Sequence, residues 1–192
     1  MTPVLGRRER RKLQTRQALA DAAFKLFEVR GYDGVTVAQI ADEADVSIAT
    51  MFKHVPDGKP ALMFDDGTER QERLLASVRD RAPGTSVLTA LRAFLATRGV
   101  FTTNLPPELR RKRELIMNTP ALAEYQRKLW LVGEDALADV LAAASSPDTP
   151  HAAIRALARY VLEVPELAGR EPNPRAALDA IFERLQKGWC DT

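Results

Sequence analysis

The sequence of 192 residues has one cysteine, Cys190, and two histidines. A single cysteine excludes an internal disulfide framework and a cysteine-rich metal site. No run approaches the ~18 consecutive apolar residues that a membrane-spanning helix needs. No apolar segment typical of a secretory signal follows Met1. From these absences we expect a cytoplasmic protein that has no disulfide, no metal and no membrane partner.

The sequence also lacks the patterns that usually carry catalysis. Its histidines, His54 and His151, are far apart in the chain. No metal-ligand spacing, glycine-rich phosphate loop or nucleophile elbow is present. Cys190 has no base close to it in the sequence. Nothing here favours an enzyme, and we expect no cofactor.

Positive charge is concentrated at the N-terminus. The chain carries a net charge of only +2, but its first sixteen residues hold one acidic residue, Glu9, and six basic ones: Arg7, Arg8, Arg10, Arg11, Lys12 and Arg16. A basic arm on an otherwise balanced protein suggests attraction to a polyanion. A solubilising tail would have the same composition, so charge alone leaves both interpretations open.

Apolar residues recur at helical spacing along the chain, and no segment alternates as a strand would. The pattern predicts an all-α protein with helices at about 13–30, 36–45, 48–54, 61–80, 87–95, beyond Pro106, 120–144, 150–164 and 174–189. The helices at 36–45 and 48–54 are short and are separated by a tight turn, which is the helix-turn-helix arrangement. A turn at 56–60 marks the predicted domain boundary.

Several of these helices begin with recognisable caps. Thr36 and Gln39 have the spacing of a capping box, and Ser47 is placed to cap the helix at 48–54. Three later starts pair a capping side chain with proline at the first helical position: Thr119-Pro120, Thr149-Pro150 and Asn173-Pro174.

Residues 19–62 carry many apolar, small and polar residues at fixed spacings: Ala22-Ala23, Leu26-Phe27, Gly31-Tyr32, Thr36-Val37, Ile40-Ala41, Ala44, Val46-Ser47, Thr50, His54, Lys59 and Leu62. This pattern resembles the N-terminal signature of the TetR family. The resemblance implies a three-helix helix-turn-helix DNA-binding domain at 1–60, which includes the basic arm. It implies a larger helical bundle at 61–192 for ligand sensing and dimerisation.

The implied function is that of a sequence-specific transcriptional regulator, a ligand-released repressor that acts as a homodimer on a palindromic double-stranded DNA operator. The sequence departs from the family pattern at three places. Asp45 stands where the turn usually has glycine, and Phe52 stands where a tyrosine often reaches a phosphate. The stretch between His54 and Lys59 is one residue longer than usual.

A helix that reads the major groove presents small or polar side chains outward. In the helix at 48–54 these are expected to be Ile48, Ala49, Thr50 and Lys53. Phosphate contacts are expected from the end of the preceding helix, the turn and the basic arm, through Thr36, Ser47, Thr50, His54, Lys59, Arg11 and Arg16.

Some of these side chains have other uses. Thr36 and Ser47 cap helices in any case, and His54 can simply end its helix. By its position in the family pattern, Phe52 is also a candidate DNA contact. Its aromatic side chain is nevertheless expected to pack in the core with Met51 and Val55.

The last two helices resemble the dimerising helices of the family. Their apolar seam would consist of Ile154, Leu157, Val161, Leu178, Ile181, Phe182 and Leu185, although these residues can also pack only inside one protomer. By position in the family, the large side chains of the central helices would line a pocket for an apolar or aromatic effector. They are Phe94, Phe101, Met117, Tyr125, Trp130 and Tyr160, and by default they are core residues.

Two other functions fit parts of the sequence. A nonspecific or architectural DNA-binding protein would also carry the basic arm. A helical small-molecule-binding protein or enzyme that has lost DNA binding would share the helical pattern. The arm and the small outward residues of the helix at 48–54 argue against the second alternative.

Overall fold

The computed structural model describes residues 6–102 and 105–188, and Cys190 lies outside them. The described residues form helices joined by turns and contain no strand, so the predicted all-α fold is confirmed. None of their helices is long and apolar enough to cross a membrane. The helices are α1 (Arg7–Arg30), α2 (Val37–Glu43), α3 (Ile48–His54), η1 (Lys59–Met63), α4 (Thr68–Arg79), α5 (Val87–Ala96), η2 (Gly99–Phe101), α6 (Pro107–Asn118), α7 (Pro120–Leu131), α8 (Glu134–Ala143), α9 (His151–Gly169) and α10 (Pro174–Lys187).

The chain divides into two compact units. The first contains residues up to Asp65 together with Glu114–Tyr125, and the second contains Asp66–Arg113 and the chain from Gln126 onward. The first unit is therefore larger than the segment 1–60 expected from the sequence. It also takes in the end of α6 and the first half of α7.

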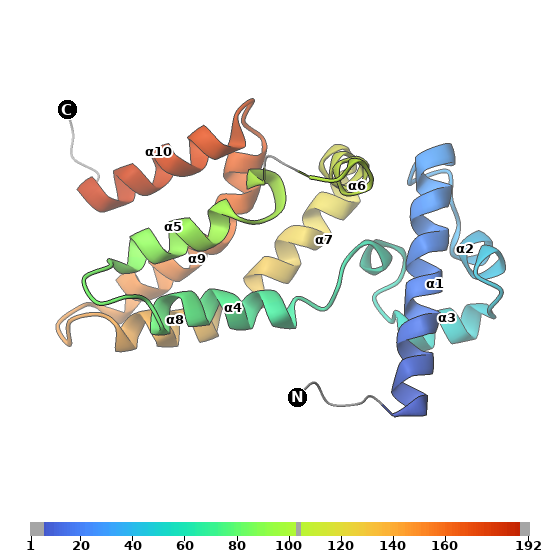
Figure 1. Cartoon of the computed structure of the whole chain (residues 1–192), viewed down its shortest axis with the longest axis horizontal. Helices are drawn as coiled ribbons and strands as arrows, with labels where there is room; N and C mark the ends of the chain where they lie inside the picture. The colour runs from blue at the N-terminus through green and yellow to red at the C-terminus, as the bar shows by residue number, and fades with distance from the viewer. Residues whose placement is uncertain (1–5, 103–104, 189–192) are drawn as a thin grey trace. The chain divides into compact units, whose positions relative to one another are not determined.

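In the first unit, α1 packs against α2, α3 and η1 (Figure 1). One apolar face of α1 supplies most of the contact, because its buried residues recur at helical spacing. Ile116 of α6 and Leu122 of α7 belong to the same core cluster, and Leu122 is fully buried. The other buried members include Leu19, Ala23, Phe27, Ile40, Met51 and Val55.

In the second unit, α4 packs against α5 and α8, α9 runs along α8, and α10 contacts α5 and α9 (Figure 1). Its core is built from aliphatic side chains of these helices with two phenylalanines. The most deeply buried members include Val78, Leu91, Leu137, Ala158, Val161, Leu178 and Phe182.

The prediction of one helix over 61–80 is wrong. The chain forms the short 3-10 helix η1, becomes extended at Phe64, and restarts as α4 only at Thr68. Gly67 adopts φ +75°, which ends helical continuity at no steric cost for glycine. The Asp66 carboxylate accepts a hydrogen bond from the Thr68 amide and so satisfies an unpaired donor at the start of α4.

The predicted helix at 120–144 is also divided, because α7 ends at Leu131 and α8 begins at Glu134, after Gly133. In contrast, α9 continues past 164 to Gly169 with Pro165 inside it. Proline lacks the amide that would complete the helical hydrogen bond, but Val164 and Ala168 are both buried, so core packing continues the helix through this point.

Candidate nucleic-acid interface

The start of α2 is fixed by the predicted capping box. The Thr36 hydroxyl accepts from the Gln39 amide at 3.2 Å, and the Gln39 side-chain oxygen accepts from the Thr36 amide at 2.8 Å. Two backbone donors are thereby satisfied reciprocally. Thr36 is exposed, so its cap leaves this end of α2 open to solvent.

The turn between α2 and α3 uses aspartate where glycine is usual. Asp45 has φ +52°, in the left-handed region. The Val46 amide donates to the carbonyl of Ala41 at 2.9 Å, and the Asp45 amide donates to that of Asp42 at 3.0 Å. These bonds form a Schellman motif, which reverses the chain directly after α2. The turn therefore forms despite the missing glycine.

Helix α3 begins and ends where the sequence predicts. The Ser47 hydroxyl accepts from the Thr50 amide at 3.1 Å and also hydrogen-bonds to the Thr50 hydroxyl at 2.8 Å. Met51 and Val55 are fully buried and attach the helix to the core of the first unit. Thr50 lies next to this buried side and is half-buried, and its hydroxyl is hydrogen-bonded to the capping Ser47.

The opposite face of α3 is exposed and mixed in chemistry. Ile48 and Phe52, one turn apart, are 47% and 45% exposed. Ala49 and Lys53, also one turn apart, are exposed beside them. The expectation that Phe52 packs in the core is wrong, because a seven-residue helix turns only Met51 inward. The exposed face of α3 thus consists of an apolar pair and a small residue next to a cation.

Arg16 holds the end of α3 from the side of α1. Its two terminal nitrogens donate to the carbonyl oxygens of His54 and Phe64, each at 3.1 Å. The His54 carbonyl is one of those that a helix end leaves without a partner. His54 itself is half-buried, and its Nδ1 atom is buried without a hydrogen-bond partner among the described residues.

Lys59, the first residue of η1, binds backbone carbonyls of the loop before α2, as Arg16 binds those at the end of α3. Its Nζ atom donates to the carbonyls of Tyr32 and Val35, at 2.8 and 3.0 Å. The same ammonium lies 3.9 Å from the centroid of the Tyr32 ring. Such a contact adds a cation–π attraction to the hydrogen bonds. Lys59 therefore ties the loop between α1 and α2 to η1.

A third connection comes from α7. The Tyr125 hydroxyl donates to the Asp57 carboxylate at 2.7 Å, and its ring lies 5.7 Å from that of Phe64. Burial and this hydrogen bond raise the pKa of Tyr125 to about 12. Sequence reasoning missed all three connections, because the partners are separated by 24 to 68 positions along the chain.

The basic arm is helical from Arg7 onward, so α1 starts earlier than the predicted residue 13. Arg7, Arg8, Arg10, Arg11 and Lys12 are all exposed. The Arg11 carbonyl accepts a hydrogen bond from the Thr15 hydroxyl, and Arg11 is exposed to solvent. The arm thus presents a dense row of cations on the first turns of α1.

Residues 19–63, which include α2, α3 and the turn between them, match the sequence model of the bacterial regulatory proteins of the tetR family. The helix-turn-helix segment of this chain is thus of the tetR-family type. The family consists of DNA-binding transcriptional regulators, and the match covers the helix-turn-helix of the first unit.

Two regulators resemble this chain in sequence. Transcriptional regulator MftR of Mycobacterium tuberculosis is 25% identical over 140 residues, which cover 73% of this chain and 70% of MftR. The HTH-type transcriptional regulator TcmR of Streptomyces glaucescens is 34% identical over 95 residues, but these cover 49% of this chain and only 42% of TcmR.

The fold is similar to that of a solved repressor. NalD, the secondary repressor of the MexAB-OprM multidrug efflux pump in Pseudomonas aeruginosa, aligns with a TM-score of 0.55 and 23% identity. The alignment covers 91% of this chain and 96% of NalD. An N-terminal helix-turn-helix followed by a larger helical region is therefore the architecture of this chain.

The six side chains predicted to line an effector pocket are divided between the two units. Met117 and Tyr125 are in the first unit. Phe101 is buried in the core of the second unit. The other three, Phe94, Trp130 and Tyr160, pack at the edge of that same core.

Trp130 stacks on the Arg70 guanidinium, whose carbon lies 4.6 Å from the ring centroid. Beside this pair is a void of only about 10 Å³. A void of that size holds about one water molecule. An effector that enters here must therefore displace Trp130 or Arg70.

The seven predicted dimer residues are divided between the core and its edge. Ile154, Val161, Leu178 and Phe182 are at most 7% exposed within the second unit. Leu157, Ile181 and Leu185 are half-buried and pack against the same core. The four buried residues therefore serve the protomer itself, which is one of the two alternatives that the sequence leaves open.

Proposed function

We propose that the protein is a ligand-released repressor that binds a palindromic operator as a homodimer. The first unit binds DNA, and the second senses a small molecule and dimerises. One observation carries the DNA-binding part: α3 is firmly capped and anchored, yet keeps Ile48 and Phe52 nearly half exposed beside Lys53. Apolar side chains exposed on a fixed helix are typical of a binding surface.

We expect this exposed face of α3 to read bases. Ala49 permits close approach to the groove, Ile48 can contact a thymine methyl group, and Lys53 can donate to guanine. We expect Ser47, Thr36 and the arm, Arg11 included, to contact phosphates, which sets position without reading sequence. Arg16 and Lys59 instead act through the backbone carbonyls they bind, and so position α3 and the loop before α2.

The test is a selection of bound fragments from random DNA, followed by binding to single-base variants of the consensus. We expect a palindromic consensus. Lys53→Ala should relax preference at one or two base pairs in each half-site, by ~1–3 kcal/mol for each base that Lys53 no longer reads. His54→Ala should weaken all variants by a similar factor.

Lys187→Ala is the matched control, because Lys187 is an exposed lysine of α10. It should change nothing. Enrichment of no consensus would contradict sequence-specific binding. A uniform loss of affinity across the panel in Lys53→Ala would place Lys53 among the phosphate contacts.

We propose that the outward sides of α9 and α10 form the dimer contact, with Leu157, Ile181 and Leu185 at its border. Light scattering should then give about twice the chain mass of 21.3 kDa. Ile181→Glu should produce monomers, because an apolar contact cannot hold an unpaired charge. Val29→Glu, at an apolar residue of α1 that is 79% exposed, is the control. A monomeric unmodified protein at micromolar concentration would contradict this part of the proposal.

The effector is expected to be small and apolar or aromatic, because three leucines and Trp130 form the apolar part of the lining of the void. Binding there should raise the melting temperature and release the operator at the same ligand concentrations. A ligand that stabilises the protein without affecting the operator complex would contradict ligand-controlled release.

A further inference from the structure

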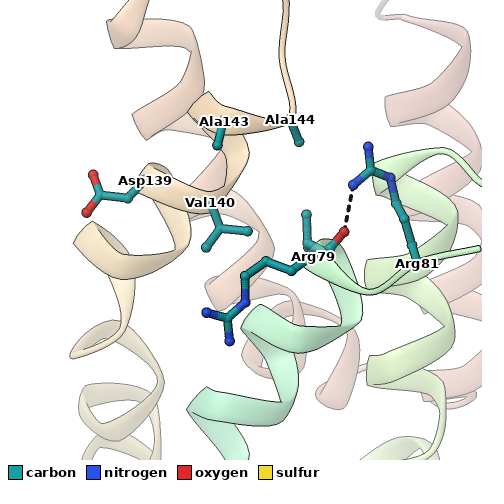
Figure 2. A pocket seen from close by; sticks show the side chains of 7 residues that line it. Arg79, Arg81, Asp139, Val140, Ala143 and Ala144 are labelled. Carbon is teal, nitrogen blue, oxygen red and sulfur yellow. Dashed lines mark hydrogen bonds between the residues drawn. The ribbon is translucent and has the colours of Figure 1, made fainter.

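A second hollow in the second unit lies at the end of α4 and along the C-terminal half of α8 (Figure 2). Its volume of about 390 Å³ is in the range of small-molecule sites, ~300–1,000 Å³. It does not share a lining residue with the void beside Trp130. The lining residues are Val78, Arg79, Arg81, Asp139, Val140, Ala143 and Ala144.

The floor of this hollow is apolar. Val78 is fully buried, and Val140 and Ala144 are half-buried around it. Ala143 is exposed at the rim. Figure 2 shows the side chains of α8 facing the end of α4 across the opening. An alkyl chain or a small ring placed here would cover aliphatic surface that is partly open to water.

One cation at the hollow is fixed in place. Arg81 donates through Nε to the carbonyl of Thr85 at 3.2 Å and through Nη1 to that of Val78 at 2.6 Å, the second bond being the dashed line in Figure 2. Its guanidinium is half-buried. The five N–H donors of arginine exceed these two bonds, so donors remain for a ligand.

A second cation flanks the same opening. Arg79 is exposed, and within residues 6–102 and 105–188 neither Arg79 nor Arg81 forms an ion pair. The only acid in the lining is Asp139, and Figure 2 shows its carboxylate directed away from the opening. The hollow therefore combines an apolar floor with two guanidinium groups that lack acidic partners in the described part of the chain.

We propose that this hollow binds a small amphipathic carboxylate, with its apolar part on Val78 and Val140 and its anionic group on the exposed guanidinium of Arg79. Guanidinium groups bind carboxylates through paired, charge-assisted hydrogen bonds, and the fixed Arg81 guanidinium adds positive charge at the same opening. The proposal concerns ligand binding alone, so it does not depend on operator binding or on release from DNA.

The test is a titration of the full chain with octanoate, followed through methyl NMR signals of Val78, Val140 and Ala143. Octanoate should shift these signals in a saturable manner, whereas octylamine and octan-1-ol should bind at least about tenfold more weakly. Arg79→Gln should weaken octanoate binding about tenfold, which equals about 1.4 kcal/mol. Ala143→Trp should fill the hollow and abolish the shifts.

Arg73→Gln is the matched control, because Arg73 is an exposed arginine on the same helix that pairs with Glu69. It should bind octanoate as the unmodified chain does. Three results would overturn the proposal: shifts at Leu162 instead of Val140, equal affinity for octylamine, or unchanged binding in Arg79→Gln. Operator binding is measured separately, so a chain that binds DNA but not octanoate refutes only this site.

Discussion

Replacing Arg16 by methionine distinguishes a positioning residue from a DNA contact. In the structure, its guanidinium supplies hydrogen bonds to the carbonyls of His54 and Phe64. A hydrogen bond to a charged group contributes ~1.5–3 kcal/mol, but both bonds are half-buried and water can replace part of them. We therefore expect Arg16→Met to lower the free energy of unfolding by about 2 kcal/mol. That loss of stability corresponds to a melting temperature lower by roughly 4–8 °C.

Salt dependence of DNA binding supplies the second measurement. Removing one phosphate contact reduces the slope of log affinity against log salt by ~0.9. Arg16→Met should weaken DNA binding with the slope unchanged, because α3 is no longer held in position while the phosphate contacts remain. The matched control is Arg11→Met on the same helix, where Arg11 is exposed to solvent. It should leave stability unchanged and reduce the slope. A stable Arg16→Met protein with a reduced slope would refute this reasoning and make Arg16 a phosphate contact.

Three further substitutions test the region around α3. Phe52→Tyr adds a hydroxyl to a side chain that is already 45% exposed, so DNA affinity should rise severalfold with stability within ~0.5 kcal/mol, as measured by operator titration and urea unfolding. Asp45→Gly removes the left-handed strain at φ +52° and should raise the unfolding free energy by ~1 kcal/mol; a decrease would show that the Asp45 side chain stabilises the turn. The pKa of Tyr125 is about 12 when folded and 10.0 in its ordinary state, so its stabilising effect is complete below pH 10 and fades between pH 10 and 12. Tyr125→Phe should flatten that alkaline fall in urea melts, and an unchanged fall would contradict the assignment.

Local chemistry made the helix-turn-helix predictable. Capping at Thr36, Ser47 and Asn173 depends on side chains within three residues of the amides they bind, and each cap forms as expected. The boundaries of α3 follow from such a cap and from the burial of Met51 and Val55. The all-helical fold follows from apolar spacing, which is likewise a local signal.

Tertiary packing decided the features that the sequence did not predict. The apolar run Ala61-Leu62-Met63-Phe64 continues a helical pattern into α4, although Gly67 interrupts the backbone there. The sequence pattern ends a helix just before Pro165, but buried neighbours carry α9 through this proline. Residue type alone assigns Phe52 to the core, and only the geometry of α3 turns it outward. The partners of Arg16, Lys59 and Tyr125 depend on the folded arrangement of distant segments.

The residues that form the core of the first unit determine where this protein can be truncated or joined to another. Leu122 is fully buried against side chains from the first 65 residues, and Ile116 joins it there. A fragment that ends near residue 65 would expose that apolar surface and leave Asp57 without its tyrosine partner. The segment that defines the family in sequence is therefore smaller than the segment that folds. A chimeric regulator that takes its N-terminal segment from another protein must also take residues 114–125 from that protein, so that the core of the first unit is complete.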